Sequence, residues 1–417
     1  MSLSDLFADF TRFLHSEEFR HMARHPEHPS AFTRQRKLPL PSLIAIMLTG
    51  LCRSVQAELD QFFGHLRQHA QLERAVSEQA FAQARAKLSP GALPSLNDYL
   101  IEQAEQAGWI LRWQGLRLVA ADASPVRFGL RASHVRRAAN RDQIAFGLYL
   151  PGTEMMLAAS LHSVHEGERQ MLFEHLERLR EDDMLLLDRG YPARWLVALL
   201  NQRGIHFCMR VEKSGNNGFA CVRDFLSAGL TEQVVTLRAP DPCDVADFGC
   251  PATPQTVRLV RHQTPSGRVR VLMTNALDQT RFPAEDFGDL YHRRWRIEEA
   301  FKRLKHRLNL EHVSGLSRQA VNQDFAAKVL CDNLEALVAL AARQTHPLPE
   351  GQRINRAYVH TVMKPLLPAL LLGRAATSWL QDSLVLIARR TFKHREGLSK
   401  PRKPRPKPHK HMSQKAC

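Results

Sequence analysis

Leu116-Arg117-Leu118-Val119-Ala120-Ala121-Asp122 is an almost wholly apolar run that ends on a carboxylate. A second run of the same kind, Met184-Leu185-Leu186-Leu187-Asp188, ends 66 residues later. Short apolar runs bounded by polar residues are typical of buried strands in an α/β sheet. Because ligands of open α/β sheets gather at strand ends, Asp122 and Asp188 are candidates for one site.

The order of predicted elements around these runs indicates the fold class. Strand-like runs at 116–122, 143–150, 155–163, 183–188 and 205–211 are joined by helical stretches at about 168–180 and 192–203. Three strands, a helix, a strand, a helix and a strand predict a ribonuclease-H-like α/β core. In that core Asp122 lies on the first strand, and Asp188 ends the fourth, which is its neighbour in the sheet.

Further segments predict the domain organisation. We expect a helical N-terminal DNA-binding domain (1–110), a catalytic domain (111–320) with a β-rich insertion at about 212–265, a helical C-terminal region (321–392) and a basic disordered tail (393–417). The apolar residues from Leu43 to Phe62 follow one helical stripe. The tail holds nine Lys and Arg residues against one Glu, a composition that cannot build a core.

Charge bounds the partner. The 417 residues carry a formal net charge of +16 with an ordinary apolar fraction of 44%. Such a balance favours a polyanionic partner, nucleic acid above an anionic membrane surface. The apolar segment 38–51 is too short to cross a bilayer, so we expect no membrane partner and a cytoplasmic protein.

Cysteine and histidine patterns predict no special chemistry. The seven cysteines lack any C-x-x-C pair, which predicts reduced thiols without a zinc site. The histidines lack a ligand spacing, and His162 and His165 are interpreted as polar surface residues. Gly147, Gly152 and Gly167 form no phosphate-cradling loop, so no nucleotide cofactor is expected.

A third carboxylate, Glu298, lies in a strongly basic helix predicted over about 284–308. At about 100° per residue, Tyr291, Arg294, Glu298 and Lys305 share an arc of about 60°. Magnesium prefers a few oxygen ligands plus a substrate phosphate, so a carboxylate flanked by cations suits metal binding beside a phosphate backbone. A surface ion pair between Arg294 and Glu298 explains the same spacing, and both interpretations stay open.

These motifs together resemble a known family. Tyr291-x₂-Arg294-x₃-Glu298-x₆-Lys305 is similar to the Y-R-E-K signature of DDE transposases in the insertion-sequence-four family. The resemblance runs over about residues 30–315. It also rests on Asp122-Ala-Ser124, Asp188-Arg189-Gly190-Tyr191, Met273-Thr274-Asn275, Phe32-to-Leu38 and Gln79-to-Leu88.

The resemblance implies a cut-and-paste DNA transposase. Asp122, Asp188 and Glu298 would be both catalytic residues and ligands of two Mg²⁺ or Mn²⁺ ions, which serve cleavage and strand transfer. The implied partners are the double-stranded terminal inverted repeats, the target DNA and a second copy in a DNA-bound homodimer, with the dimer region at about 322–390.

Candidate DNA contacts follow from the resemblance and from basic clusters. They are Tyr291, Arg294, Lys305, Arg189, Lys302, Arg34, Arg36, Lys37 and Arg85. For the N-terminal residues, a solvated helical cap is the alternative. Some relatives stack a tryptophan of the β insertion on a flipped base, but this chain has no Trp between 196 and 294.

Two rival functions remain. One is a catalytically inactive, DNA-binding regulator of transposition, which the presence of all three carboxylates disfavours. The other is a ribonuclease-H-like nuclease that cuts DNA without strand transfer.

Overall fold

The computed structural model describes residues 1–34, 37–69, 71–128, 139–212, 219–264, 267–375 and 377–393. Arg36 and the tail after Lys393, both named above, lie outside these ranges. The chain divides into two compact units built from discontinuous segments. The helical unit comprises 1–109, 125–144 and 302–417, and the sheet unit comprises 110–124 and 145–301.

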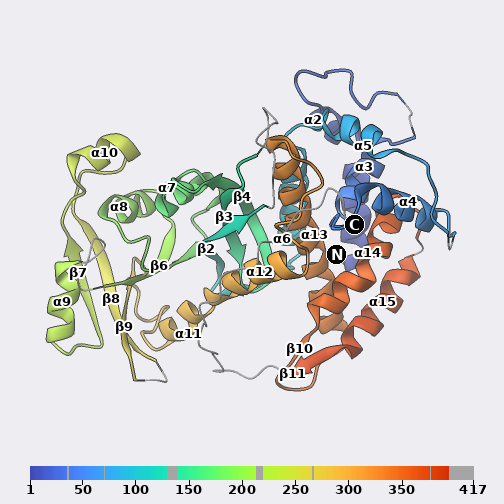
Figure 1. Cartoon of the computed structure of the whole chain (residues 1–417). Helices are drawn as coiled ribbons and strands as arrows, with labels where there is room; N and C mark the ends of the chain where they lie inside the picture. Colours follow the sequence, from blue (N-terminus) through green and yellow to red (C-terminus); the bar gives the residue numbers. More distant parts are fainter. Residues whose placement is uncertain are drawn as a thin grey trace. The chain divides into compact units, whose positions relative to one another are not determined.

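One mixed sheet organises the sheet unit (Figure 1). Its strands are β1 (Arg112–Trp113), β2 (Leu116–Arg127), β3 (Asp142–Leu150), β4 (Met155–Ser163), β5 (Asp183–Leu187), β6 (His206–Val211), β7 (Glu232–Leu237), β8 (Gln255–Gln263) and β9 (Val269–Thr274). They follow the order β4-β3-β2-β5-β6-β9-β8-β7, with β1 paired to β2. The pairs β2–β5 and β5–β6 are parallel, whereas β6–β9, β9–β8 and β8–β7 are antiparallel.

This topology confirms the predicted ribonuclease-H-like α/β core. The strand carrying Asp122 pairs with the strand that leads into Asp188, as expected. Their register places Ala120 opposite Leu186, each two residues before its carboxylate. Parallel strands in this register bring Asp122 and Asp188 to the same level of the sheet.

The segment at 212–265 extends the core sheet and does not form a separate one. Its strands β7 and β8 join the sheet beyond β9, and the helices α9 (Ala220–Ser227) and α10 (Pro242–Phe248) accompany them. The insertion therefore holds helices as well as the expected strands. Among the core helices, α8 (Arg194–Gln202) and α11 (Asp286–His292) both pack against β6 and β8, and Figure 1 shows them on opposite sides of the sheet.

A buried ion pair joins β2 to β5. Arg117 and Asp183 are register partners with fully buried side chains. The guanidinium donates from Nε to Oδ1 at 2.6 Å and from Nη2 to Oδ2 at 2.9 Å. This two-bond geometry satisfies both charges without water, and it lies on the two strands that carry the aspartates.

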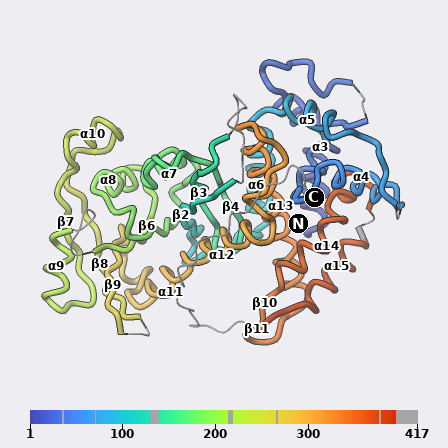
Figure 2. Tube along the Cα trace, viewed as in Figure 1, coloured from blue at the N-terminus to red at the C-terminus, as the bar shows by residue number. Residues whose placement is uncertain are grey.

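The helical unit packs around one long helix, α13 (Arg318–Thr345). Its other elements are α1 (Leu3–Leu14), α2 (Glu17–Met22), α3 (Leu40–Met47), α4 (Val55–Leu66), α5 (Glu78–Arg85), α6 (Ala92–Gln106), α14 (Arg356–Leu371), α15 (Thr377–Arg389), β10 (Gln352–Ile354) and β11 (Thr391–Lys393). In Figure 2 the blue N-terminal helices lie beside the red C-terminal ones, and α14 contacts α1, α3 and α4.

The expected single stripe from Leu43 to Phe62 is wrong, because two helices share it. The backbone turns at Gly50, whose φ of +66° is a left-handed conformation that favours glycine. A second left-handed glycine, Gly373 with a φ of +64°, lies between α14 and α15. In the described part of the chain, the helices are too short or too polar to cross a bilayer.

Candidate active site

Three carboxylates enter the site from three elements of the sheet unit. Asp122 lies on β2, Asp188 directly follows β5, and Glu298 lies in the first turn of α12 (Trp295–His306). The side chains of Asp122 and Glu298 are 17% and 19% exposed. A carboxylate so far removed from water favours a nearby cation or a bound proton.

Arg294 is the positive charge between two of these carboxylates. Its side chain is 7% exposed, and its guanidinium lies 3.3 Å from Glu298 Oε1 and 3.9 Å from Asp122 Oδ1. The predicted pairing of Arg294 with Glu298 therefore exists, but it is buried and includes Asp122. The Arg294 Nε and Nη1 atoms are buried without a hydrogen-bond partner among the described residues, so this guanidinium retains donors for a ligand.

The negative charges of the site outweigh the single positive charge of Arg294. Burial raises the pKa of Asp122 to about 7, Arg294 opposes the shift, and the negative charges of Glu298 and Asp188 add to it. Oxygen donors that repel one another and are partly desolvated suit a hard divalent cation. The residues present therefore fit magnesium or manganese.

This raised pKa predicts a pH-dependent stability. A carboxyl whose folded pKa lies above its unfolded value of about 3.8 stabilises the fold only while protonated, so its contribution is lost as pH rises through about 7. We expect Asp122→Asn to raise the free energy of unfolding of the metal-free protein at pH 8 by up to a few kcal/mol, at about 1.4 kcal/mol per pKa unit, and with it the melting temperature. The gain should be nearly lost near pH 4, because the folded carboxyl is protonated there and the unfolded one is close to its own pKa of 3.8.

Thermal melts in chelator at pH 4, 6 and 8 measure this effect. Glu299→Gln is the matched control, because Glu299 is more than half exposed beside Glu298 and should leave the pH profile unchanged. A wild-type profile that is parallel to that of Asp122→Asn would show that Asp122 does not titrate near neutrality.

The loop after Asp188 is held by the start of α7 (Glu168–Phe173). Arg169 donates from Nε to the Gly190 carbonyl at 3.1 Å and from Nη2 to the Pro192 carbonyl at 3.0 Å. The Gly190 N–H donates to Asp188 Oδ1 at 2.7 Å. A Cβ at position 190 would lie 3.0 Å from that oxygen and 3.1 Å from Glu168 Oε2, which explains a glycine here.

Glu168 is a fourth carboxylate that sequence reasoning missed. Burial raises its pKa, and the charge of Asp188 raises it further. Glu168 ends no apolar run and belongs to no motif, so only the folded structure identifies it as part of the site.

The predicted continuous helix over 284–308 is wrong, and the difference shapes the site. α11 ends at His292 and α12 starts at Trp295. The N–H groups of Arg294 and Ile297 bond to carbonyls three residues back, at 3.1 Å each, which is the tighter 3₁₀ pattern. Tyr291 and Arg294 therefore share no helix face with Glu298. Lys305 does lie on α12 with Glu298, and its Nζ donates to the Pro125 carbonyl at 2.6 Å.

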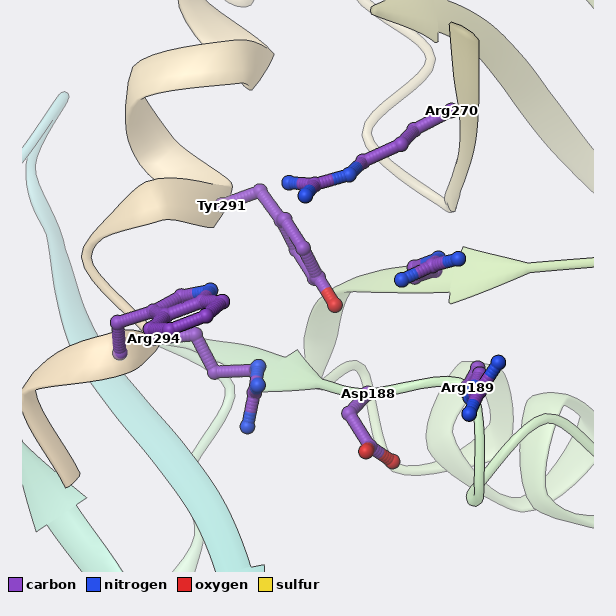
Figure 3. Close-up of a pocket in the computed structure, with 7 residues that line it drawn as sticks. Asp188, Arg189, Arg270, Tyr291 and Arg294 are labelled. Carbon is purple, nitrogen blue, oxygen red and sulfur yellow. The ribbon is translucent and has the colours of Figure 1, made fainter. Parts of the chain in front are cut away.

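A small cationic pocket of about 60 Å³ adjoins Asp188 (Figure 3). In Figure 3 the Tyr291 and Arg294 side chains extend toward the strand end at Asp188, while Arg270 reaches in from β9. The lining residues are Asp188, Arg189, Arg210, Arg270, Tyr291, Arg294 and Trp295. Sequence reasoning missed Arg210, Arg270 and Trp295. The two arginines belong to antiparallel neighbours, β6 and β9, a pairing that local spacing does not reveal.

The remaining predicted DNA contacts differ in whether their side chains reach solvent. Arg34, Lys37, Arg189 and Lys302 are exposed. Arg34 and Lys37 line a cavity of about 650 Å³ in the helical unit. Arg85, by contrast, is 4% exposed. It pairs with Asp324 at 2.8 Å and donates to Gln323 and the Ala320 carbonyl. The prediction of a DNA contact for Arg85 is therefore wrong, because its guanidinium is consumed inside the helical unit.

His162 also departs from expectation. It is 8% exposed, not a surface residue. Its Nε2 lies 2.6 Å from Ser160 Oγ and its Nδ1 lies 2.7 Å from Glu166 Oε2. Strand β4 turns this side chain inward, which a spacing of three between histidines did not indicate.

The fold and the site define a class: ribonuclease-H-like enzymes whose clustered acidic residues bind divalent metal ions for phosphoryl transfer at DNA. The profile of the transposase DDE domain matches residues 113–334. The chain belongs to this DDE transposase family, whose members are DNA-cleaving and strand-transferring enzymes that use divalent metal ions.

Two relatives accompany this match. The chain is 24% identical over 314 residues to the transposase InsG of insertion sequence element IS4 from Escherichia coli strain K12, covering 72% of this chain and 70% of that one. A piggyBac transposase solved in a synaptic complex with hairpin DNA aligns over 91% of this chain and 85% of its own, at 9% identity and a TM-score of 0.43.

Proposed function

We propose that this DNA transposase cleaves the ends of its own insertion sequence and joins them to target DNA by using Asp122, Asp188 and Glu298 as metal ligands. The observation that carries the proposal is the convergence of the acidic side chains on one buried arginine. The negative charges of Glu298 and Asp188 both raise the pKa of Asp122. The geometry agrees: the Arg294 guanidinium lies 3.3 Å from Glu298 Oε1 and 3.9 Å from Asp122 Oδ1, and the β2–β5 register brings Asp188 level with Asp122.

Each residue has a defined task. The three carboxylates would hold two Mg²⁺ or Mn²⁺ ions, which activate the attacking oxygen and stabilise the leaving one. Arg294, whose Nε and Nη1 lack a hydrogen-bond partner among the described residues, donates to a phosphate oxygen and offsets the charge around Asp122. Arg169 positions Asp188 through the loop carbonyls, and the Gly190 N–H orients the Asp188 carboxylate.

The pocket beside Asp188 would take the DNA end. Arg189, Arg210 and Arg270 present guanidinium groups suited to phosphate oxygens. Trp295 is 42% exposed, and an exposed aromatic ring is a stacking platform for an unpaired base. Trp295 would therefore stack on a flipped base in place of the tryptophan that the β insertion lacks.

We expect Arg270→Gln to weaken binding of the DNA end and to reduce the salt dependence of the binding constant by about one phosphate contact, a slope change of roughly 0.9. A salt titration of binding to an end fragment measures it. Arg223→Gln on α9, an exposed arginine of the same unit, is the control. An unchanged slope for Arg270→Gln would remove this residue from the DNA path.

The proposed function also requires particular DNA partners and a second copy of the protein. The terminal inverted repeats would be the recognised DNA, with Arg34 and Lys37 as further phosphate contacts. A DNA-bound homodimer through the C-terminal helices α13 to α15 would pair two ends. The net charge of +16 supports an extended polyanionic partner.

Strand transfer separates this proposal from a simple nuclease. A labelled linear fragment ending in the element's own terminus is incubated with protein, Mg²⁺ or Mn²⁺, and a circular target plasmid. We expect cleavage at the element boundary and a labelled product covalently joined to the plasmid. Cleavage without a joined product would favour a nuclease, and binding without cleavage under either metal would favour an inactive regulator.

A further inference from the structure

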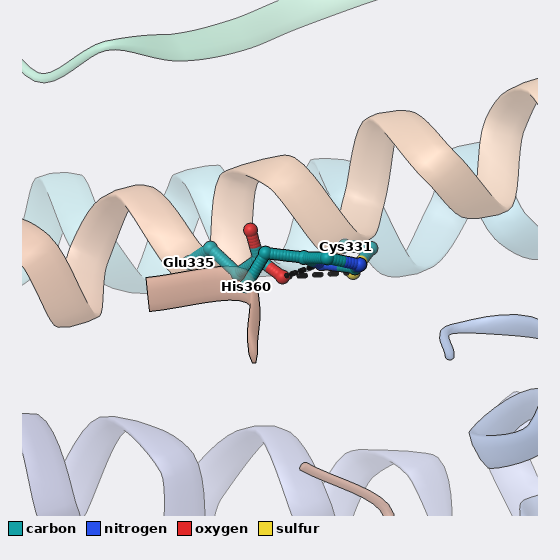
Figure 4. Close-up of side chains that lie close together, drawn as sticks. All are labelled: Cys331, Glu335 and His360. Carbon is teal, nitrogen blue, oxygen red and sulfur yellow. Dashed lines mark hydrogen bonds and ion pairs between the residues drawn. The ribbon is translucent and has the colours of Figure 1, made fainter. Parts of the chain in front are cut away.

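The helical unit contains a second group of metal-ligand side chains, far in sequence from the acidic site. Cys331 and Glu335 lie one turn apart on α13, and His360 lies on α14. Their sulfur, oxygen and nitrogen atoms all lie within 4.8 Å of one another. Figure 4 shows Cys331 and His360 both directed at the Glu335 carboxylate.

The geometry points to a zinc-binding site formed by Cys331 Sγ, a Glu335 carboxylate oxygen and His360 Nδ1. Zinc is the common ion that accepts sulfur, nitrogen and oxygen donors together. Bond lengths of about 2.0 to 2.3 Å in a tetrahedron place ligand atoms roughly 3.3 to 3.6 Å apart. The Cys331 Sγ to Glu335 Oε1 distance is 3.5 Å and the His360 Nδ1 to Oε1 distance is 2.7 Å, so small side-chain rotations suffice.

Burial explains why this group favours a cation. Glu335 is 3% exposed and Cys331 is 2% exposed. A buried carboxylate requires a nearby hydrogen-bond donor or positive charge, and the His360 ring lies 2.7 Å from it through Nδ1. Burial and the charge of Glu335 raise the pKa of the Cys331 thiol, so without metal the thiol keeps its proton and donates a hydrogen bond to the carboxylate. Zinc binding releases that proton to solvent and supplies the charge that the thiolate needs.

A cavity beside His360 gives a metal ion a route from solvent to the site. It has a volume of about 340 Å³, and His360 lines it together with residues of α4 and α14, among them Glu58 and Lys364. Lys364 forms an ion pair with Glu58 at 3.2 Å. The Glu58 carboxylate offsets the positive charge of Lys364, which would otherwise repel a zinc ion in the cavity. Of the three proposed ligands, His360 lines this cavity, and a zinc ion held by three protein ligands leaves a fourth position for water.

Zinc at this site would tie α13 to α14. These helices belong to the region we expect to form the homodimer, so the ion would stabilise that surface. The acidic site plays no part in this inference, and either one can fail without the other.

Cobalt(II) distinguishes the two metal sites, because only a thiolate ligand gives an intense sulfur-to-metal charge-transfer band. The full-length protein is stripped with chelator and titrated with Co²⁺. We expect the band to saturate at one equivalent and to disappear when Zn²⁺ is added. The Asp122, Asp188 and Glu298 side chains hold no sulfur and contribute nothing to this signal.

Cys331→Ser and His360→Gln are the informative variants, because each keeps a hydrogen-bond donor toward Glu335 while weakening metal ligation. We expect both to lose the band and the rise in melting temperature that Zn²⁺ gives the wild type. Cys243→Ser, an exposed cysteine elsewhere, should keep both. Should Cys331→Ser fail to fold, the partly exposed His360 position still supplies the test. A wild type without the band, or a band that persists in His360→Gln and Cys331→Ser, would overturn the assignment.

Discussion

Replacing any one of Asp122, Asp188 or Glu298 by its amide should abolish DNA cleavage. Asn and Gln keep the size of the side chain and remove the negative charge that binds a divalent ion. The loss of several kcal/mol of transition-state stabilisation corresponds to about 10³-fold or more in rate. Single-turnover cleavage of a labelled DNA end measures it.

DNA binding separates this effect from misfolding. Affinity for the end fragment in chelator should stay within about threefold of the wild type, because phosphate contacts come from the basic residues. Glu299→Gln is again the matched control, since the Glu299 carboxylate is next to Glu298 in the chain but pairs with Arg296. A variant that retains a tenth of wild-type cleavage would not have lost a metal ligand.

Breaking the buried pair between Arg117 and Asp183 should have the largest effect on stability. Asp183→Leu leaves a guanidinium without its partner in a fully buried position. Removing one member of such a pair destabilises by about 3 to 5 kcal/mol, because an unpaired charge stays in the interior. Denaturant unfolding followed by tryptophan fluorescence gives the change in midpoint.

The double variant Arg117→Met with Asp183→Leu tests the cause. It removes both charges and should recover most of the lost stability, because apolar residues of similar volume replace the pair. The adjacent pair of Arg112 with Asp182 is the control: it has a 2.8 Å contact but is 37% and 44% exposed. Asp182→Leu should change stability by less than about 1 kcal/mol. Equal losses at 182 and 183 would show that burial does not decide the effect.

Much of the core was predictable from local pattern. The apolar runs ending at Asp122 and Asp188 correspond to β2 and β5, which pair as expected. Buried strands declare themselves by continuous apolar composition, and their order along the chain limits the possible sheets. The third carboxylate was singled out by its spacing within a basic segment.

What could not be predicted depends on contacts between distant segments. Arg117 sits in an apolar strand, and nothing local indicates that Asp183 neutralises it. Arg85 was a predicted DNA contact, yet its guanidinium pairs with Asp324, 239 residues away in the chain. The break between α11 and α12 falls at Arg293 and Arg294. Neither residue is a helix breaker such as proline or glycine, so the sequence predicted one continuous helix. The roles of the site residues stay predictions until the variants above are measured.

The wide spacing of the three carboxylates along the chain has a consequence for biosynthesis. Glu298 follows Asp188 by 110 residues, and β9, which pairs with β6, is made only shortly before it. At 5 to 20 residues per second, the ribosome takes roughly 5 to 20 seconds to cover that interval. A nascent chain that already displays the N-terminal basic residues still lacks its third acidic side chain. With the role that we propose for Glu298, the capacity to cut DNA is acquired late in synthesis, and a chain that stops early keeps its N-terminal basic residues without the complete acidic cluster.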